Sequence, residues 1–486
     1  MASTSSSVGA LAAVAGGEVI GDATVTIGDV THDSRQVGPA TLFVAVPGEN
    51  HDGHDYLDVA IGAGAPAVMV QRRCEVSAPQ IVVDDTRIAM APVAAEVHGH
   101  PSTRLAVVGV TGTNGKTTVT HMVEAIVAAS GLVAGLIGTV HTRVGGNNIP
   151  NTRTTPESSD FQRLLAAMVE SGATVVAAEV SSHALSMHRV DATRFAVAAF
   201  TNLSQDHLDF HGDMESYFEA KAGLFDPDRS EQAVVWVDDP AGARLRSRLQ
   251  IPCLTVGTDA DISATDRDVR VDSSTFRLTT PEGQRTLTLP LGGGFNVDNA
   301  AVAAGCALML GLELDDVVGG LASFEGVPGR FELVSENDPV QIVVDYAHTP
   351  AGIRAAIAAA RATATGRVIA VFGAGGDRDR AKRPQMGTAA RAADVVVVTS
   401  DNPRTEDPEA VVDQVMAGLQ PADTVYREVD RRTAIYWAID QAVEGDLVLI
   451  LGRGHERGQE VAGRFIPFSD RLVAREALSV KRGSGR

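Results

Sequence analysis

Short apolar runs recur along the chain, and several of them are followed by residues with helical spacing. Six of these runs have wholly apolar centres, at 105–110, 174–180, 341–346, 367–373, 394–400 and 446–452. Strands that are buried on both faces read as continuous apolar runs, which is typical of parallel sheets. Their alternation with helices predicts a doubly wound α/β architecture.

Polar or glycine-rich residues follow each of the six runs. They read TGTNGKTT, EVSSH, DYAHTP, GAGGDRDR, SDNPR and GRGHE. In open α/β sheets, ligands bind beyond the carboxyl ends of the strands. The pattern therefore predicts either two nucleotide-sized crevices or one cleft that two sheets share.

Two segments divide the chain into three parts. HGHPSTR (98–104) and EGVPGRFE (325–332) contain the Pro and Gly residues that interrupt regular structure. A chain of 486 residues is also long enough for about three domains. We predict domains at 1–102, 103–327 and 328–486, with a hinge at 325–332.

Charge and hydropathy exclude several classes of protein. The net charge is −20, which argues against a general nucleic-acid surface, so any nucleotide site must concentrate positive charge locally. GDRDRAKRP (376–384) is one such concentration, although such a run is more often a solvated surface. No apolar run reaches the roughly 18 residues of a membrane span, and the N-terminus lacks the basic segment of a signal peptide. We expect a cytoplasmic protein without membrane contact.

The segment TGTNGKTT (111–118) is predicted to be a phosphate-binding loop that leads into a helix. Its backbone N–H groups and the helix N-terminus attract phosphate, and Lys116 adds a positive charge. Thr117 is placed to bind Mg²⁺. The usual loop has a glycine where Val110 stands, so the loop is a variant.

Four further side chains are candidates for chemistry. Glu179 ends a predicted strand, where a carboxylate can hold Mg²⁺ directly or through water; a paired structural role is the alternative. His207 is either a metal ligand or a hydrogen-bonded core residue. Lys221 is either a semi-buried amine with a depressed pKa, able to react in its neutral form, or a surface lysine. Asn299 either binds a base edge or packs a helix.

Eight segments, in this order and spread over nearly the whole chain, resemble the Mur ligases. They are TGTNGKTT, EVSSHAL, TNLSQDHLDFHG, the glycine- and asparagine-rich stretch at 294–304, VPGRFE, DYAHTP, DNPR and GRGHE. The resemblance also accounts for Val110, because this family uses a shortened glycine pattern. It implies a small N-terminal α/β UDP-binding domain, a central P-loop ATPase-type parallel sheet and a Rossmann-like C-terminal domain.

The resemblance implies an ATP- and Mg²⁺-dependent ligase of cytoplasmic peptidoglycan precursor synthesis, expected as a monomer. The nearest branch adds the third amino acid to UDP-N-acetylmuramoyl-L-alanyl-D-glutamate through an acyl phosphate. Lys116, Glu179, His207 and Lys221 would be catalytic. Mg²⁺ would lie on Thr117, Glu179, His207 and a carbamylated Lys221.

The resemblance also assigns binding residues. ATP would contact Gly112, Thr113, Asn114, Gly115, Lys116, Thr117, Thr118, Asn299, Arg330, Asp345 and His348. The UDP-linked substrate would contact Ser34, Thr154, Thr155, Ser181 and Arg189. The incoming amino acid would contact Arg378, Asp401, Asn402, Pro403, Arg404, Gly452 and Glu456.

The tetrapeptide DNPR (401–404) favours meso-diaminopimelate as the amino acid. This amino acid has a distal carboxylate, which Arg404 can bind in a bidentate fork, and a distal ammonium, which suits Glu456. Lysine lacks that carboxylate. The alternatives are a lysine-adding ligase, a folylpolyglutamate synthetase-like ligase, and a nucleotide-dependent switch or binding module without ligase chemistry.

Overall fold

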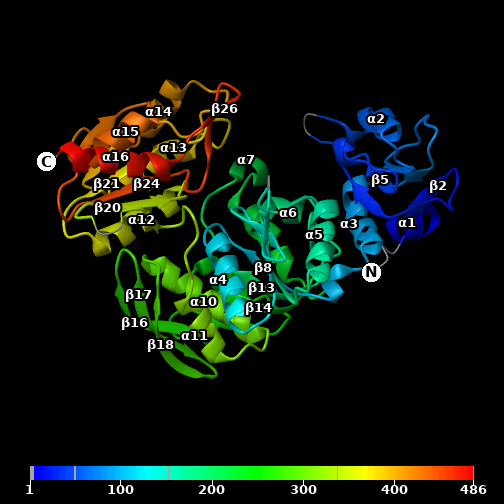
Figure 1. Cartoon of the computed structure of the whole chain (residues 1–486), viewed down its shortest axis with the longest axis horizontal. Coiled ribbons are helices and arrows are strands. Elements are labelled where there is room, and N and C mark those ends of the chain that lie inside the picture. Colours follow the sequence, from blue (N-terminus) through cyan, green and yellow to red (C-terminus); the bar gives the residue numbers. More distant parts are fainter. Residues whose placement is uncertain (1–4, 49–50, 151–152, 336–337, 485–486) are drawn as a thin grey trace.

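The computed structural model describes residues 5–48, 51–150, 153–335 and 338–484. Three α/β units follow one another along the chain, with the N-terminal unit at one end of the molecule and the C-terminal unit at the other (Figure 1). The predicted fold class is confirmed. Among the described helices, none combines the length and apolar content that crossing a bilayer requires.

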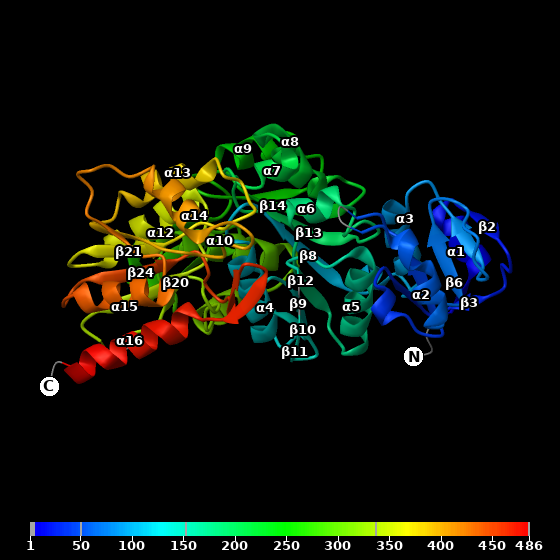
Figure 2. The ribbon, with the colours of Figure 1, turned by 90° about the horizontal axis from the view of Figure 1, so that it is seen from above.

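The N-terminal unit is built on a five-stranded sheet in the order β2-β7-β6-β5-β4. Adjacent strands of this sheet pair in parallel, except that β2 pairs with β7 in antiparallel orientation. Its elements are α1 (Val8–Ala15), β2 (Glu18–Ile20), β4 (Asp29–Thr31), β5 (Thr41–Val44), α2 (Leu57–Gly62), β6 (Ala67–Val70), β7 (Gln80–Val82) and α3 (Thr86–Val97), with a small ladder of β1 (Ser6–Ser7) and β3 (Thr26–Ile27). Helix α3 packs against α5 (Ser158–Glu170) of the central unit (Figure 2).

The central unit contains an eight-stranded sheet in the order β11-β10-β9-β12-β8-β13-β14-β15. Its strands pair in parallel, except that β10 pairs in antiparallel orientation with both β9 and β11. The strands are β8 (Ala106–Thr111), β9 (Ala134–Ile137), β10 (Thr142–Val144), β11 (Asn147–Ile149), β12 (Val175–Glu179), β13 (Phe195–Phe200), β14 (Ser230–Trp236) and β15 (Cys253–Val256).

Helices cover both faces of this sheet. One apolar core joins the sheet to α4 (Lys116–Ala129), α10 (Gly294–Met309) and α11 (Leu314–Ala322). A second core on the other face includes α5 (Ser158–Glu170). The shorter helices are α6 (Ser182–Ser186), α7 (Leu208–His211), α8 (Met214–Ala222) and α9 (Pro240–Arg246).

A three-stranded antiparallel sheet in the central unit was not predicted. It consists of β16 (Ser263–Val269), β17 (Ser274–Thr280) and β18 (Gly283–Leu289). Only one face of it is buried, so its strands alternate polar with apolar residues and show no continuous apolar run. Phe276 and Leu278 of β17 belong to the same core as α10 and α11.

The C-terminal unit has a six-stranded sheet in the order β19-β20-β24-β21-β22-β23, parallel except for β19. The strands are β19 (Glu332–Leu333), β20 (Gln341–Asp345), β21 (Val368–Phe372), β22 (Val395–Val398), β23 (Val425–Arg427) and β24 (Leu447–Leu451). Helices α12 (Pro350–Thr363), α13 (Lys382–Ala390) and α14 (Pro408–Met416) share one core with the sheet. Helices α15 (Arg431–Gln441) and α16 (Asp470–Ser484) share the other.

All six predicted strands are present as β8, β12, β20, β21, β22 and β24. Each pairs in parallel with at least one neighbour, as the apolar runs predicted. The Pro- and Gly-rich segment at 325–332 leads from α11 to β19, between the two large sheets. A hairpin of β25 (Gly458–Val461) and β26 (Arg464–Pro467) follows β24.

Candidate functional site

A cavity of about 450 Å³ lies between the central and C-terminal units. The loop before α4, the end of β12 and the segment after β13 line it from the central side, and the segment after β20 lines it from the C-terminal side. Of the two arrangements that the sequence allowed, the structure therefore has a cleft shared by two sheets. Predicted site residues on its wall are Thr113, Asn114, Gly115, Lys116, Thr117, Thr118, Thr154, Glu179, Ser181, His207, Asn299, Arg330, Asp345 and His348.

The loop before α4 is shaped by two glycines. Gly112 and Gly115 have φ angles of 145° and 88°, which L-residues rarely adopt. A Cβ atom on Gly112 would lie 1.9 Å from Thr201 Oγ1, and one on Gly115 would lie 2.5 Å from Asn299 Oδ1. Helix α4 begins at Lys116 without a side-chain cap. Its first N–H groups therefore open onto the cavity wall, as an anion site requires.

Lys116 is half-buried at the start of α4. Its Nζ donates to the carbonyl oxygens of Gly112 and Thr113, both at 2.9 Å. Burial lowers the pKa of Lys116, and the charge of Glu179 opposes that shift. A cation whose remaining partners are neutral carbonyls is well placed to bind phosphate oxygens.

Thr117 and Glu179 meet at the floor of the cavity. Thr117 Oγ1 donates to Glu179 Oε2 at 2.9 Å, and Thr139 donates to the same carboxylate through its backbone N at 2.6 Å and its Oγ1 at 3.0 Å. Glu179 is 1% exposed. All these donors are neutral, so the buried carboxylate and adjacent hydroxyl oxygens offer the hard ligands that Mg²⁺ prefers.

His207 lies on the wall of the same cavity, in a left-handed backbone conformation with a φ of 55°. Burial lowers its pKa to about 3, so its imidazole is neutral and can bind a metal ion. Within the described part of the chain, no group of three or more His, Cys, Asp or Glu residues is arranged to hold a metal. The predicted Mg²⁺ ligands differ from such a group, because they combine Glu179 and His207 with a threonine hydroxyl and a modified lysine.

Lys221 is buried on α8, only 1% exposed, which rules out the surface-lysine interpretation. Its Nζ donates to the Gly112 carbonyl at 2.8 Å and lies 4.5 Å from the centre of the Tyr217 ring. Burial, followed by the charge of Lys116, lowers the pKa of Lys221 well below its usual value. The neutral amine of such a lysine can react as a nucleophile.

Asp206, which the sequence offered only as a possible metal ligand beside His207, also pairs with residues of the C-terminal unit. Its carboxylate lies 3.3 Å from Lys382 Nζ and 3.6 Å from His348 Nε2, both in the C-terminal unit. Burial raises the pKa of Asp206, but His348, Lys382 and His207 outweigh it and hold the pKa well below its usual range. The ion pair links the two walls of the cavity. Lys382 belongs to the run 376–384, so the solvated-surface interpretation of that run is wrong for this residue.

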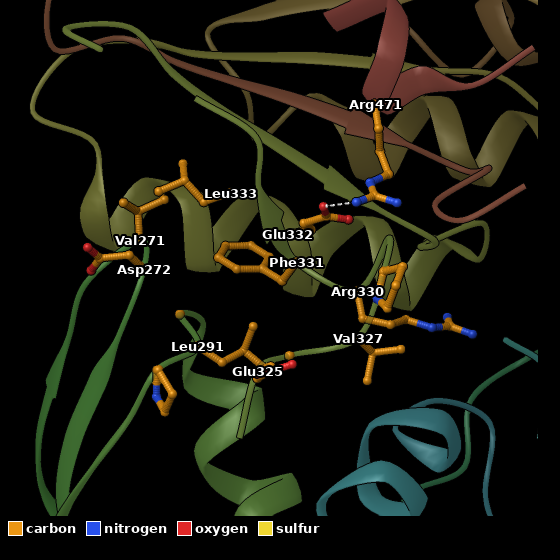
Figure 3. Close-up of a pocket in the computed structure, with 14 residues that line it drawn as sticks. Val271, Asp272, Leu291, Glu325, Val327, Arg330, Phe331, Glu332, Leu333 and Arg471 are labelled. Atoms are coloured by element: carbon orange, nitrogen blue, oxygen red, sulfur yellow. Dashed lines mark ion pairs between the residues drawn. The ribbon is translucent and has the colours of Figure 1, made fainter. Parts of the chain in front are cut away.

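The linker between the two units carries Arg330 into the cavity. Its Nη2 donates to Thr117 Oγ1 at 3.0 Å, and its guanidinium lies 4.4 Å from the centre of the Tyr346 ring. The linker, residues 325–332, also lines a second cavity of about 470 Å³, which Figure 3 shows. In this view Arg330 points towards the cyan helix. Glu332 pairs with Arg471 of α16 at 2.6 Å. Successive contacts therefore tie the linker to both units.

Asp345 and Asn299 are buried residues that line the cavity from the C-terminal unit and the central unit, respectively. Asp345 accepts hydrogen bonds from the backbone N–H groups of Phe331 at 2.7 Å and Ala347 at 2.8 Å, and burial raises its pKa. Asn299 lies against Gly115, and its Nδ2 donates to Asn296 Oδ1 at 3.1 Å. Its assignment to adenine stays a prediction.

Four of the residues predicted for the UDP-linked substrate form one group beside Glu179. Thr154 Oγ1 lies within hydrogen-bond distance of Thr139 Oγ1, at 2.9 Å. Thr155 Oγ1 donates to the Glu179 carbonyl at 2.8 Å and accepts from Ser181 N at 3.1 Å. Arg189 pairs with Glu157 at 3.0 Å.

Ser34 lies in the N-terminal unit, and none of its described contacts joins it to that group. It begins a short 3-10 helix that Asp33 caps. The two units nevertheless meet nearby, because His32 Nδ1 lies 3.3 Å from Ser159 Oγ and Arg87 pairs with Glu157 at 3.1 Å. Glu157 thus joins both sides of the predicted substrate site, a role that its sequence context did not indicate.

The predicted amino-acid residues gather at the carboxyl edge of the C-terminal sheet. Asn402 Nδ2 donates to Glu456 Oε2 at 2.8 Å, and a Cβ atom on Gly452 would lie 2.5 Å from Asp401 Oδ2. Burial, and next the charge of Asp401, raises the pKa of Glu456. The loops after β22 and β24 therefore form one polar surface.

Two arginines flank Gly375 on this surface. A Cβ atom there would lie 3.2 Å from Arg404 Nη1 and 3.9 Å from Arg378 Cγ. Arg404 has a φ of 54°, and its Nη1 donates to the Gly376 carbonyl. The Pro403 carbonyl also approaches Gly376 closely. The Arg404 guanidinium and the side-chain stem of Arg378 thus lie close to Gly375, and a guanidinium group suits a carboxylate ligand.

Comparison with known proteins gives matches over most of the chain. Residues 26–108 match the Mur ligase family catalytic domain, 110–307 the Mur ligase middle domain and 329–454 the Mur ligase glutamate ligase domain. The UDP-N-acetylmuramoyl-L-alanyl-D-glutamate–2,6-diaminopimelate ligase of Gloeobacter violaceus is 46% identical over 468 residues, which are 95% of this chain and 96% of that protein.

Solved structures agree with these matches. The structure of a UDP-N-acetylmuramoyl-L-alanyl-D-glutamate–2,6-diaminopimelate ligase is 31% identical, with a TM-score of 0.68 over 99% of this chain and 100% of that one. A MurF ligase from Thermotoga maritima in complex with ADP has the same fold, at 22% identity and a TM-score of 0.67 over 94% of this chain and 98% of that one.

Proposed function

The chain belongs to the Mur ligase family, and on this premise we propose that it joins meso-diaminopimelate to UDP-N-acetylmuramoyl-L-alanyl-D-glutamate, using ATP. The observation that carries the proposal is the shared cavity, which has the phosphate loop on one wall and Asp345 and His348 of the C-terminal unit on the other. The reaction belongs to peptidoglycan precursor synthesis and takes place in the cytoplasm. The active protein is a monomer with domains at 1–102, 103–327 and 328–486.

The reaction has two steps. An oxygen of the D-glutamate γ-carboxylate attacks the γ-phosphorus of ATP, and ADP leaves. The amine of the incoming amino acid then attacks the acyl phosphate carbonyl, loses a proton and expels phosphate to leave an amide. Carboxylate and triphosphate repel one another, so the protein must supply positive charge and hold the reactants in line.

Lys116, the start of α4 and Arg330 supply that charge from this chain's own residues. Thr117, Glu179 and His207 would hold Mg²⁺, with a carbamate formed on Lys221. Bound there, Mg²⁺ neutralises the charge of phosphate oxygens. The buried carboxylate of Glu179, whose hydrogen-bond donors are neutral, supports this assignment.

The amino acid binds across the loops after β22 and β24. Arg404 and Arg378 bind its distal carboxylate, and Glu456, which Asn402 holds in place, accepts its distal ammonium. Thr154, Thr155, Ser181 and Arg189 hold the UDP-linked substrate near Glu179, with Ser34 on the uridine side. The two substrates thus approach the phosphate loop from opposite domains.

Product formation tests the proposed function directly. Purified protein is incubated with ATP, Mg²⁺ and the UDP-linked dipeptide, together with meso-diaminopimelate, lysine or glutamate in parallel. We expect rapid phosphate release and tripeptide formation with meso-diaminopimelate, and only a low rate with lysine or glutamate. Tripeptide formation with lysine alone would make it a lysine-adding ligase, and phosphate release that ignores the other substrates would favour a nucleotide-dependent switch.

Replacement of Arg404 tests the choice of amino acid. In Arg404→Leu, kcat/KM for meso-diaminopimelate should fall by about 100-fold, or about 2.7 kcal/mol, because a bidentate charge-assisted contact is lost. The low rate with lysine should stay within about twofold, since lysine has no distal carboxylate to pair with Arg404. Equal losses for both amino acids would contradict the charge-pairing argument.

A further inference from the structure

Arg453 is buried between the two loops of the amino-acid pocket. It lies between β24 and β25 and is 0% exposed. Its Nη1 donates to Asn402 Oδ1 at 2.7 Å and lies 3.4 Å from Glu456 Oε2, and its Nη2 donates to the Gly458 carbonyl. One guanidinium therefore contacts both loops.

Asn402 is held in one orientation by this arrangement. Its Oδ1 accepts from Arg453 and from the backbone N–H of Glu460 at 2.9 Å, which leaves its Nδ2 to donate to Glu456 Oε2 at 2.8 Å. A reversed amide would place its N–H₂ group against two donors. The contact between Asn402 and Glu456 is thus a consequence of the position of Arg453.

We propose that Arg453 is the positioning residue that holds Asn402 and Glu456 together and keeps the Glu456 carboxylate charged for the ammonium group of the incoming amino acid. The inference rests on the proposed function, because it gives Glu456 a ligand. The chemistry follows from the side chain: a guanidinium stays charged at any working pH, so a buried one needs an anion beside it.

The charged and titratable groups around Glu456 show why its carboxylate needs Arg453 beside it. Burial, and next the charge of Asp401, which follows β22, raises the pKa of Glu456, while Arg453 opposes that shift most strongly, followed by Asn402 and His348. Burial, and next the charge of Glu456, raises the pKa of Tyr346. Burial lowers the pKa of Arg431 on α15, but the charges of Asp470, Asp401 and Glu456 outweigh it and raise that pKa. Loss of Arg453 should therefore raise the pKa of Glu456 further.

The test measures KM for meso-diaminopimelate in wild type, Arg453→Met and Arg453→Lys over the whole pH range in which the protein stays folded, with the other substrates saturating. In wild type, KM should rise as the pH falls through the pKa of Glu456, because the protonated carboxyl cannot pair with an ammonium. In Arg453→Met, this rise should begin at least about one pH unit higher, and KM should be about 10- to 100-fold above wild type. Arg453→Lys keeps the charge, so its rise should begin near the wild-type pH.

Arg367→Met is the matched control. Arg367 pairs with Asp446 at 2.7 Å. Asp446 directly precedes β24, whereas Arg453 follows the other end of that strand. This variant loses an ion pair of the same sheet but should keep the wild-type KM and its pH dependence. A merely structural role of Arg453 would raise all three substrate KM values together, without moving the pH of the rise, and this result would overturn the proposal.

Thermal unfolding gives a second measurement that does not depend on turnover. Glu456→Gln should lower Tm more in the wild-type background than in Arg453→Lys, because only the guanidinium is bound to both Asn402 and Glu456. Additive Tm changes in the double variant would overturn the proposed coupling. If wild type uses an amino acid other than meso-diaminopimelate, the proposed function fails, while the same measurements with that amino acid still decide the role of Arg453.

Discussion

Lys116→Ala should lower the rate of amide synthesis by at least about 1,000-fold, which corresponds to about 4 kcal/mol of transition-state stabilisation. Lys116 Nζ is held at the cavity by two backbone carbonyls and has no carboxylate in hydrogen-bond contact among its described partners. Its charge is therefore available to the phosphate that is transferred between two anions. Alanine keeps the helix but removes this charge.

Initial rates of tripeptide formation measure the effect, at ATP concentrations well above the KM of each variant. Lys481→Ala is the matched control, because Lys481 Nζ also rests on backbone carbonyls, at 2.9 Å from Ile439 O, 2.7 Å from Asp440 O and 2.6 Å from Ala442 O, but lies on α16. The control should retain its turnover. A rate for Lys116→Ala within tenfold of wild type would refute the proposed role of the phosphate loop.

Lys221→Met should lower kcat by about 100-fold or more without unfolding the protein. A buried ammonium with a carbonyl and an aromatic ring as partners is costly, so an apolar side chain of similar length should keep or raise Tm. The loss of activity would come from chemistry: the neutral amine of Lys221 attacks CO₂, an N–C bond forms, and a proton leaves to give a carbamate. The lysine then carries an anion that can help to hold Mg²⁺.

Carbamylation of Lys221 leads to a second prediction, which would fail if the lysine had only a structural role. Activity of wild type should fall when CO₂ is removed from the buffer and return with bicarbonate, and a ¹³C-labelled carbamate signal should appear with labelled bicarbonate. Lys221→Met should show neither response. A wild type that is indifferent to CO₂ and lacks the signal would leave Lys221 as an unmodified buried lysine.

Contiguous segments could be predicted from the sequence because their information is local. A strand that is buried on both faces is apolar along its length, so β8, β12, β20, β21, β22 and β24 were visible as runs. The loop at 111–118 was visible because phosphate binding needs glycines and a lysine at fixed spacing. The three-stranded sheet β16–β18 was missed because a half-buried strand alternates polar and apolar residues and leaves no such run.

Contacts between distant segments could not be predicted in the same way. Lys382 reads as part of a charged run, yet it is buried against Asp206, 176 residues away. Arg453 reads as a spacer within GRGHE, yet it holds Asn402 from another loop. Whether a lysine or arginine is solvated or buried depends on what the fold places beside it, because desolvation is decided by neighbours that the local sequence does not name.

The sequence by itself determined the α/β class, six of the parallel strands and the glycine-rich loop before α4, since each depends on residue types at short, regular spacing. The tertiary structure alone decided that two sheets share one cleft, that Lys221 is a buried amine and that Asp206 bridges the domains. These features arise from packing and charge pairing between segments far apart along the chain. Their free energies depend on distance and burial in space, and neither quantity is written in the order of the residues.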